Sequence, residues 1–250
     1  MIRWRLLLEF DGGEFAGWQR QENAPSVQAA VEEAVFAFSG ERPLVQGAGR
    51  TDSGVHATGQ VAHLDLQKQT TGETLRDALN HHLRPLPVAV LAAEPAAPDF
   101  HARFSARGRR YLYRILDRRA PAVLERGRVW WVPRRLDVEA MQAAAQRLTG
   151  RHDFTSFRAA ACQAASPIKT LDRLEVCRVD SEVRVEAAAR SFLHHQVRNL
   201  VGTLHFVGSG KWPPEEVSRV LAARDRGAAG PTAPPQGLYL TDVIYEDEAG

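Results

Sequence analysis

Residues 47–60 bring together several side chains that could take part in chemistry. They read G-A-G-R-T-D-S-G-V-H-A-T-G-Q and place Arg50, Asp52 and His56 among four glycines. Glycine suits loops whose backbone turns to positive φ or approaches other atoms closely. A carboxylate two residues after an arginine in such a loop is a candidate nucleophile or acid–base group held by a cation. The same composition is typical of a connecting turn, in which Asp bonds its own backbone, so this stretch alone leaves both interpretations open.

A second stretch, from Arg103 to Arg119, is strongly basic. It reads R-F-S-A-R-G-R-R-Y-L-Y-R-I-L-D-R-R, in which arginines outnumber acids seven to one. The planar guanidinium suits phosphates and stacks on bases, although the net charge of +2 is too small to indicate nucleic-acid binding by itself. The alternative is a solvated arginine face. The candidate RNA-backbone contacts are Arg103, Arg107, Arg109 and Arg110.

Composition excludes several classes of protein. The chain has 250 residues, 44% of them hydrophobic and 25% charged, which suits a globular protein with one large core or two ordinary ones. No apolar run could span a bilayer and the N-terminus lacks the features of a signal peptide, so we expect no membrane association. Cys162 and Cys177 form no C-x-x-C pair, which favours a reducing, cytoplasmic setting. Without a Cys/His cluster or an H-E-x-x-H motif, we expect no metal.

The first half of the chain predicts alternating strands and helices. Ser26 is a candidate N-cap, and Thr74-Leu75-Arg76-Asp77 is an acidic variant of the capping box. Periodicity and these caps predict a strand at 2–10, a helix through residue 38, a strand at 59–66, a helix from 74 that ends by Pro85, and a strand at 88–93.

The second half repeats this order with an additional hairpin. Asp137 is the candidate N-cap of a helix that ends before Gly150. The linker at 226–237, R-G-A-A-G-P-T-A-P-P-Q-G, is predicted to be flexible or extended. The other predicted elements are strands at 109–117, 170–179 and 182–189, helices at 137–148, 192–207 and 214–223, and a last strand at 237–245.

These elements predict an α+β fold of two pseudo-symmetric halves. Their sheets should be largely antiparallel and covered by helices on one side, which leaves the other sides free to form an active-site cleft between the halves. Pro95 and Pro98 mark a break in composition. We therefore predict an N-terminal domain at 1–106, which carries the loop 47–60, and a C-terminal domain at 107–250 that completes the cleft.

Six strings, taken together and in order, resemble the tRNA pseudouridine synthase A family over essentially the whole chain. Besides the loop 47–60, they are E-F-D-G-G-E-F-A-G-W-Q-R-Q at 9–21, F-H-A-R-F-S-A-R-G-R-R-Y-L-Y-R-I at 100–115, G-R-H-D-F-T-S-F-R at 150–158, F-L-H-H-Q-V-R-N-L-V-G at 192–202 and G-L-Y-L at 237–240. A lone R-T-D would be weak evidence, whereas the ordered set is specific.

The resemblance implies an isomerase that converts uridine to pseudouridine at positions 38–40 of the tRNA anticodon stem-loop, as a homodimer and without a cofactor. Asp52 would be the catalytic aspartate, and Arg50 matches the family's arginine two places before it. Tyr111 would pack on the target base, Arg198 would pair with Asp52, and Leu238 would line the base pocket. The stretch 155–170 departs from expectation because it has few side chains able to grip RNA.

Two other classes of protein compete with this hypothesis. Duplicated α+β halves with basic and aromatic strands also suit a non-catalytic RNA-binding module, which would leave the loop around Asp52 unexplained. A phosphate-binding hydrolase is disfavoured because G-A-G-R-T-D lacks the lysine and hydroxyl of a P-loop. Tyr111 and Leu238 have packing as their alternative role, and Arg198 could be a solvated helix arginine. His56 and Gln60 are better explained as scaffolding of the loop than as acid–base groups.

Overall fold

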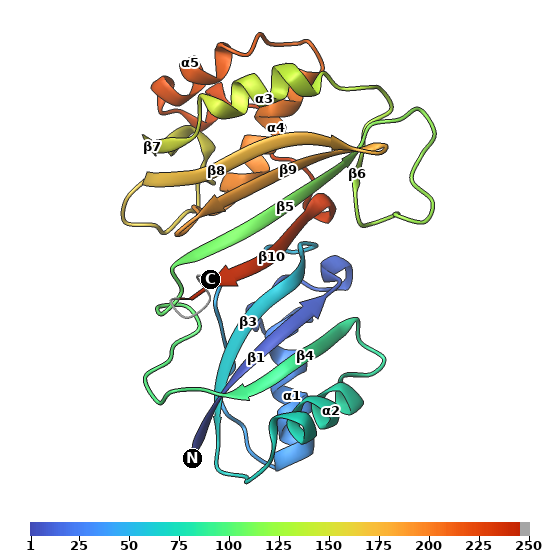
Figure 1. Ribbon diagram of the computed structural model, residues 1–250, viewed down its shortest axis with the longest axis vertical. Helices are drawn as coiled ribbons and strands as arrows, with labels where there is room; N and C mark the ends of the chain where they lie inside the picture. Colours follow the sequence, from blue (N-terminus) through green and yellow to red (C-terminus); the bar gives the residue numbers. More distant parts are fainter. Residues whose placement is uncertain (246–250) are drawn as a thin grey trace. The chain divides into compact units, whose positions relative to one another are not determined.

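The computed structural model describes residues 1–245 and contains two compact units (Figure 1). Unit 1 comprises Met1–Arg107 together with the chain from Tyr239 onward, and unit 2 comprises Gly108–Leu238. The limits 1–106 and 107–250 remain a prediction of where independent domains end. The last strand belongs to unit 1 because its backbone pairs with a strand of that unit.

The sheet of unit 1 has the strand order β4-β1-β3-β10. The pairs of β1 with β3 and with β4 are antiparallel, whereas β10 runs parallel to β3 through Tyr239 and Leu240. A short strand, β2, pairs with β3 beside the glycine-rich loop. The bounds are β1 Ile2–Phe10, β2 Gln46–Gly47, β3 His56–Leu66, β4 Val88–Pro95 and β10 Leu238–Ile244.

Two helices, α1 (Val27–Ser39) and α2 (Gly72–Leu83), lie behind this sheet in Figure 1. They cover the face on which the alternate apolar residues of β1 are buried, as the period-two pattern predicts. Ser26 caps α1, with its hydroxyl accepting from Ala29 N. The predicted cap Thr74 is wrong, because the helix already begins at Gly72. Thr71 caps α2 instead, with its hydroxyl accepting from Thr74 N. A Cβ on Gly72 would overlap the carbonyl oxygen of Ala93 in β4.

The sheet of unit 2 has the strand order β5-β9-β8-β7, with every pair along it antiparallel. A two-residue strand, β6, adds to β5 in parallel. Strands β8 and β9 form the predicted hairpin, whose turn places Asp180 at a φ of 54°. The bounds are β5 Gly108–Leu116, β6 Trp130–Trp131, β7 Gly150–Asp153, β8 Ile168–Val179 and β9 Glu182–Ala189.

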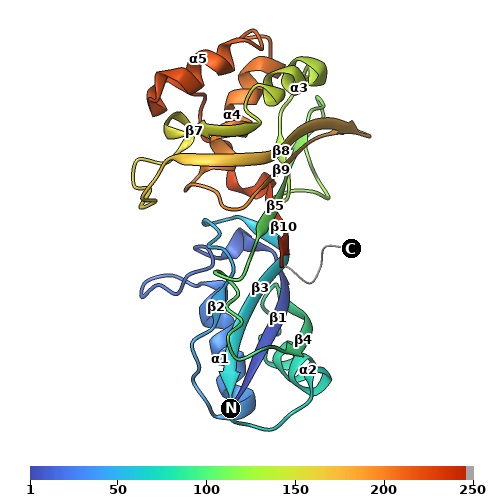
Figure 2. The same ribbon diagram turned by 60° about the vertical axis from the view of Figure 1, so that its left-hand side comes forward.

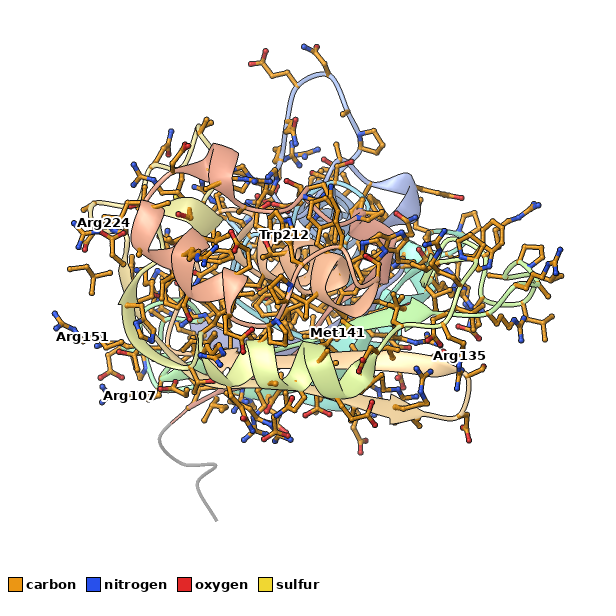
Figure 3. The ribbon with its side chains drawn as sticks, turned by 90° about the horizontal axis from the view of Figure 1, so that it is seen from above. Arg107, Arg135, Met141, Arg151, Trp212 and Arg224 are labelled. Atoms are coloured by element: carbon orange, nitrogen blue, oxygen red, sulfur yellow. The ribbon has the colours of Figure 1, made fainter. Side chains whose placement is uncertain are left out.

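Three helices lie on one side of this sheet, as Figure 2 shows: α3 (Val138–Gln146), α4 (Gln196–Gly208) and α5 (Glu216–Ala223). Met141 of α3, labelled in Figure 3, lies against Gly208 of α4, where a Cβ would come within 2.5 Å of its sulfur. Short 3-10 turns connect the elements at Gly12–Glu14, Thr155–Phe157, Arg226–Ala228 and Pro235–Gly237. The predicted α+β class, with mostly antiparallel sheets, is confirmed.

The helix predicted at 192–207 begins later, at Gln196. His195 before it has a left-handed backbone with φ of 62°, which interrupts a right-handed helix. Most side chains of α4 are buried, so it is a central helix of unit 2 and not an amphipathic surface helix. Across residues 1–245, none of the helices is both long enough and apolar enough to cross a membrane.

Gly59→Ala tests the docking of the last strand. A Cβ on Gly59 would overlap the carbonyl oxygen of Thr241 in β10, and backbone can yield less than a flexible side chain. Overpacking of this kind should lower the free energy of unfolding by about 1–3 kcal/mol. Urea unfolding followed by tryptophan fluorescence measures it. The neighbouring Thr58→Ala, at an exposed position of β3, is the control and should stay within about 0.5 kcal/mol. Equal stability of the two variants would contradict the docking.

Candidate active site

The loop that carries Asp52 connects β2 to β3 and is held at its base by Gln60. The Gln60 side chain is completely buried, its Nε2 donates to Gly49 O at 2.8 Å, and its Oε1 accepts from Gly49 N at 3.4 Å. An amide side chain thus satisfies the backbone N–H and carbonyl of one residue, Gly49, which lies outside the strands. Arg50, the next residue, is exposed, whereas Asp52 is half-buried.

The backbone around Asp52 is fixed by the preceding loop at 12–18. Trp18 N donates to Thr51 O at 3.1 Å, and Gly17, at a φ of 103°, lies so close that a Cβ would come within 2.5 Å of the same oxygen. The Trp18 ring packs equally tightly on Gly47. Glycine is therefore required at these positions for close approach, as the sequence predicts.

Asp52 begins a tight turn. Its carbonyl oxygen accepts from Val55 N at 3.1 Å, and Gly54 adopts a φ of 77° within the turn. The hydroxyl of Ser53 and the backbone N–H of Gly54 both donate to Phe15 O, each at 3.3 Å. These bonds engage main-chain groups on both sides of Asp52. The backbone that carries the Asp52 carboxylate is therefore fixed.

His56 belongs to the scaffold of the loop. Gly12 N donates to its Nδ1 at 3.0 Å, and its ring stacks on Tyr239 of β10 with centroids 4.8 Å apart. The side chain is only 2% exposed. Together with the bonds of Gln60, this geometry assigns both residues to support of the loop, as the sequence indicated.

The segment before β5 is anchored in unit 1 through two histidines. Burial is the main cause that lowers the pKa of His63 to about 4, so the ring is neutral near pH 7 and its Nδ1 accepts from Ala102 N at 3.2 Å. Burial also lowers the pKa of His101, whose Nε2 lies 3.1 Å from Gln46 Oε1. Phe104, between Arg103 and Arg107, is 73% exposed, a feature that periodicity did not reveal.

The two tyrosines of β5 have different environments. Tyr113 is fully buried and its hydroxyl donates to Pro234 O at 2.7 Å. Burial raises the pKa of Tyr113, against the opposing charge of Arg198, so this phenol keeps its proton. Tyr111 is half-buried and contacts Phe192 edge-to-face at 5.1 Å. Tyr113 is therefore a structural residue, and Tyr111 has surface left for a ligand.

Arg198 and Leu238 are both held by the segment that precedes β10. Arg198, half-buried on α4, donates from Nε to Ala233 O at 2.8 Å, and its own carbonyl accepts from Ala233 N at 3.0 Å. Leu238 is 5% exposed and follows Gly237, where a Cβ would lie 2.6 Å from the Tyr113 ring. Arg198 is thus not the solvated helix arginine considered as the alternative.

The four arginines predicted to contact RNA differ in exposure. Arg103, Arg107 and Arg110 are exposed. Arg109 is 8% exposed and donates from Nη1 to Arg190 O at 2.7 Å, which ties the end of β5 to the end of β9. A structural contact thus occupies one guanidinium of the predicted cluster.

The predicted site residues fall in both units. Asp52 and Arg50 lie together in unit 1, whereas Tyr111, Arg198 and Leu238 lie in unit 2. The pairing of Asp52 with Arg198 remains a prediction. Sequence reasoning missed the buried polar residues that hold the segment before Leu238. The asparagine at position 199, inside a predicted helix, could have indicated them. Asparagine is unfavourable inside a helix unless its side chain has a specific partner.

Comparison with known proteins covers Asp52, Arg198 and Leu238 in the family model, whereas Tyr111 lies between its two matched segments. The sequence model of a family described as tRNA pseudouridine synthase matches residues 7–105 and 144–246. The tRNA pseudouridine synthase A of Rhodospirillum centenum is 63% identical over 98% of this chain and 100% of its own length. The protein of the same name from Paramagnetospirillum magneticum is 59% identical over 100% of this chain and 98% of its own. The chain therefore belongs to the tRNA pseudouridine synthase family, a family of isomerases.

Proposed function

We propose that this isomerase converts uridine to pseudouridine at positions 38, 39 and 40 of the tRNA anticodon stem-loop. Asp52 is the nucleophile or base, and no cofactor takes part. The enzyme acts in the cytoplasm as a homodimer. The family match and the relatives named tRNA pseudouridine synthase A support the substrate, and the family resemblance supports the positions and the dimer.

The observation that carries this proposal is the fixed backbone on both sides of Asp52. Breaking the N1–C1′ glycosidic bond builds positive charge on the sugar, which a nearby carboxylate stabilises or traps, as in glycosidases. A carboxylate that is already oriented does not spend binding energy on ordering itself. The bonds of Thr51, Gly54 and Val55 to neighbouring segments or to the turn itself provide that order.

The target base must leave its stack before it can react. Extrusion of a nucleotide costs a few kcal/mol, less in a loop than in a stem. Phosphate contacts by exposed arginines offset that cost without reading sequence. The half-buried ring of Tyr111, held edge-to-face by Phe192, offers a surface for the extruded uracil.

Release of tritium from tRNA labelled at C5 of uridine tests the reaction, because isomerisation to pseudouridine replaces the C5–H bond with the new glycosidic bond. Mapping of pseudouridine in the product RNA gives the positions. Release with modification at 38–40 supports the proposal. Tight binding of tRNA without release would identify a non-catalytic RNA-binding protein, and modification at other positions would refute the assigned specificity.

Asp52→Asn should abolish turnover and leave tRNA affinity within a few-fold of wild type. The amide is nearly isosteric with the carboxylate but cannot act as an anionic nucleophile or base. Loss of a central nucleophile costs on the order of 10⁴–10⁶ in rate. The exposed Asp77→Asn on α2 makes the same chemical change and should have wild-type activity. Residual activity of Asp52→Asn above about a hundredth of wild type would remove Asp52 from this role.

Replacement of Arg103, Arg107 or Arg110 by alanine should weaken tRNA binding and its dependence on salt. Removal of a guanidinium that contacts a phosphate should reduce the magnitude of the slope of log K against log salt by roughly 0.7–0.9. Filter binding at several salt concentrations measures the slope. Arg76→Ala on α2, at a half-buried arginine that pairs with Asp77, controls for the loss of one charge. An unchanged slope in the triple variant would show that the cluster is a solvated face.

Tyr111→Phe separates two roles of that residue. Phenylalanine keeps the ring, so stacking worth roughly 1–3 kcal/mol per base should survive, whereas a hydroxyl able to carry a proton is lost. If the hydroxyl removes the proton at C5, turnover should slow and the isotope effect from deuterium at C5 should rise together. We expect normal tRNA binding in this variant and failure of base capture in Tyr111→Ala. A near-normal rate for Tyr111→Phe would refute proton transfer and leave stacking.

A further inference from the structure

The linker that the sequence predicts to be flexible or extended is bound along α4. This segment, residues 226–237, is called the strap here. Gly230 N donates to Thr203 Oγ1 at 3.0 Å, and Ala233 N donates to Arg198 O at 3.0 Å. The two backbones approach so closely that a Cβ on Gly202 would overlap Pro231 O. The strap is thus in contact with the helix between Arg226 and Ala233.

Arg226 holds the beginning of the strap through neutral oxygens. Its Nη1 donates to Gly230 O at 2.9 Å, and its Nη2 donates to Asn199 Oδ1 and Thr232 Oγ1, both at 3.1 Å. Across residues 1–245 this guanidinium has no carboxylate partner, and burial lowers its pKa. The hydrogen bonds from the guanidinium to these three oxygens therefore stabilise a partly desolvated charge that has no counter-ion in the described part of the chain.

Asn199 connects the strap to the core of unit 2. It is fully buried, its Nδ2 donates to Phe157 O at 2.8 Å, and its Oδ1 accepts from the Thr232 hydroxyl at 2.7 Å. Thr232 therefore accepts from Arg226 and donates to Asn199 with one oxygen. Removal of that hydroxyl takes away the bond of the strap to Asn199 and one of the acceptors of Arg226, and leaves only the direct bond of Arg226 to Asn199 between these side chains.

The other end of the strap reaches two of the predicted site residues of unit 2, Arg198 and Leu238. Ala233, directly after Thr232, accepts the Nε–H of Arg198. Pro234 accepts the Tyr113 hydroxyl, and Gly237 packs on the Tyr113 ring immediately before Leu238. A displacement of the strap would therefore move the acceptor of Arg198 and the backbone of Leu238 together.

We propose that Arg226 and Thr232 are positioning residues for the isomerisation, acting through the strap on Arg198 and Leu238. This inference rests on the proposed function of those two residues. Both side chains are engaged by oxygens of the strap and of α4, so the role proposed for them is indirect. Their contribution is the placement of the Arg198 guanidinium, and misplacement of a catalytic group by about 1 Å can cost 100-fold in rate.

Thr232→Val and Arg226→Lys test the proposal in the full-length enzyme. Valine keeps the shape of threonine without the hydroxyl, and lysine keeps the charge of Arg226 without its fork. We expect kcat to fall by about 10- to 100-fold, with KM for tRNA within about two-fold. Thr232→Ser, which keeps the hydroxyl, should restore most of the activity. Arg219→Lys on α5, at a side chain 82% exposed, is the matched control and should behave as wild type.

Two readouts separate positioning from general support of the fold. Each variant is combined with Arg198→Lys: positioning through Arg198 predicts little further loss of kcat, whereas an independent defect multiplies the losses. The NMR signal of the Arg198 Nε–H should lose its protection from solvent exchange in Thr232→Val. Wild-type kcat in Thr232→Val, multiplied losses, or an unchanged signal would each overturn the inference. Absence of turnover by the wild-type enzyme would refute the proposed function, and the NMR signal would still test the strap.

Discussion

The buried side-chain amide of Gln60 provides the constraint on which the Asp52 loop depends. It bonds both the N–H and the carbonyl of Gly49, in a place where strand pairing has ended. A buried backbone group left without a partner costs about 1–3 kcal/mol, and the half-buried groups of Gly49 would lose part of that. A side-chain amide carries both a donor and an acceptor, so it can satisfy the N–H and the carbonyl of one residue without requiring another strand. The loop can therefore leave the sheet and still remain ordered.

The same device recurs elsewhere in both units. Asn80 of α2 bonds the N–H and carbonyl of Val90 at 2.8 Å each, which fixes the helix against β4. Asn199 of α4 ties the strap to the helix and to Phe157. Gln196 accepts from Leu193 N at the start of α4. Side-chain amides thus order irregular backbone at Gly49 and Leu193 and, at Val90, also fix a helix against a paired strand.

Sequence periodicity predicted the longer strands and helices because burial enforces it directly, but it missed the short strands β2, β6 and β7. The alternation in β1 and the caps Ser26 and Asp137 have local causes, and the structure contains them as predicted. The start of α4 was predicted too early because a left-handed His195 leaves no hydrophobic signature. The partner of the last strand was also beyond the pattern, since alternation identifies a strand without stating which sheet it joins.

The residues of the candidate site could be predicted in part, because several of them lie within distinctive motifs. Asp52, Tyr111 and Arg198 lie within motifs whose letters are distinctive, so the resemblance identifies them. The order of the strap depends on long-range bonds of Asn199 and Arg226, 27 residues apart. Proline and glycine in the strap suggest a flexible chain when read locally. Its order results from tertiary contacts that no local pattern encodes.

In the proposed reaction, the ordered loop around Asp52 and the strap before Leu238 have different tasks. The carboxylate must remain fixed while the glycosidic bond breaks and re-forms, which requires an ordered loop around Asp52. The uracil must turn between those events, so a wall that bonds its oxygens in one orientation would hinder the second step. In the proposed role of Leu238 as a wall of the base pocket, its side chain would offer only apolar surface, and hydrophobic contact has no preferred direction. A rigid backbone that presents an apolar side chain can therefore exclude water and still permit the base to rotate.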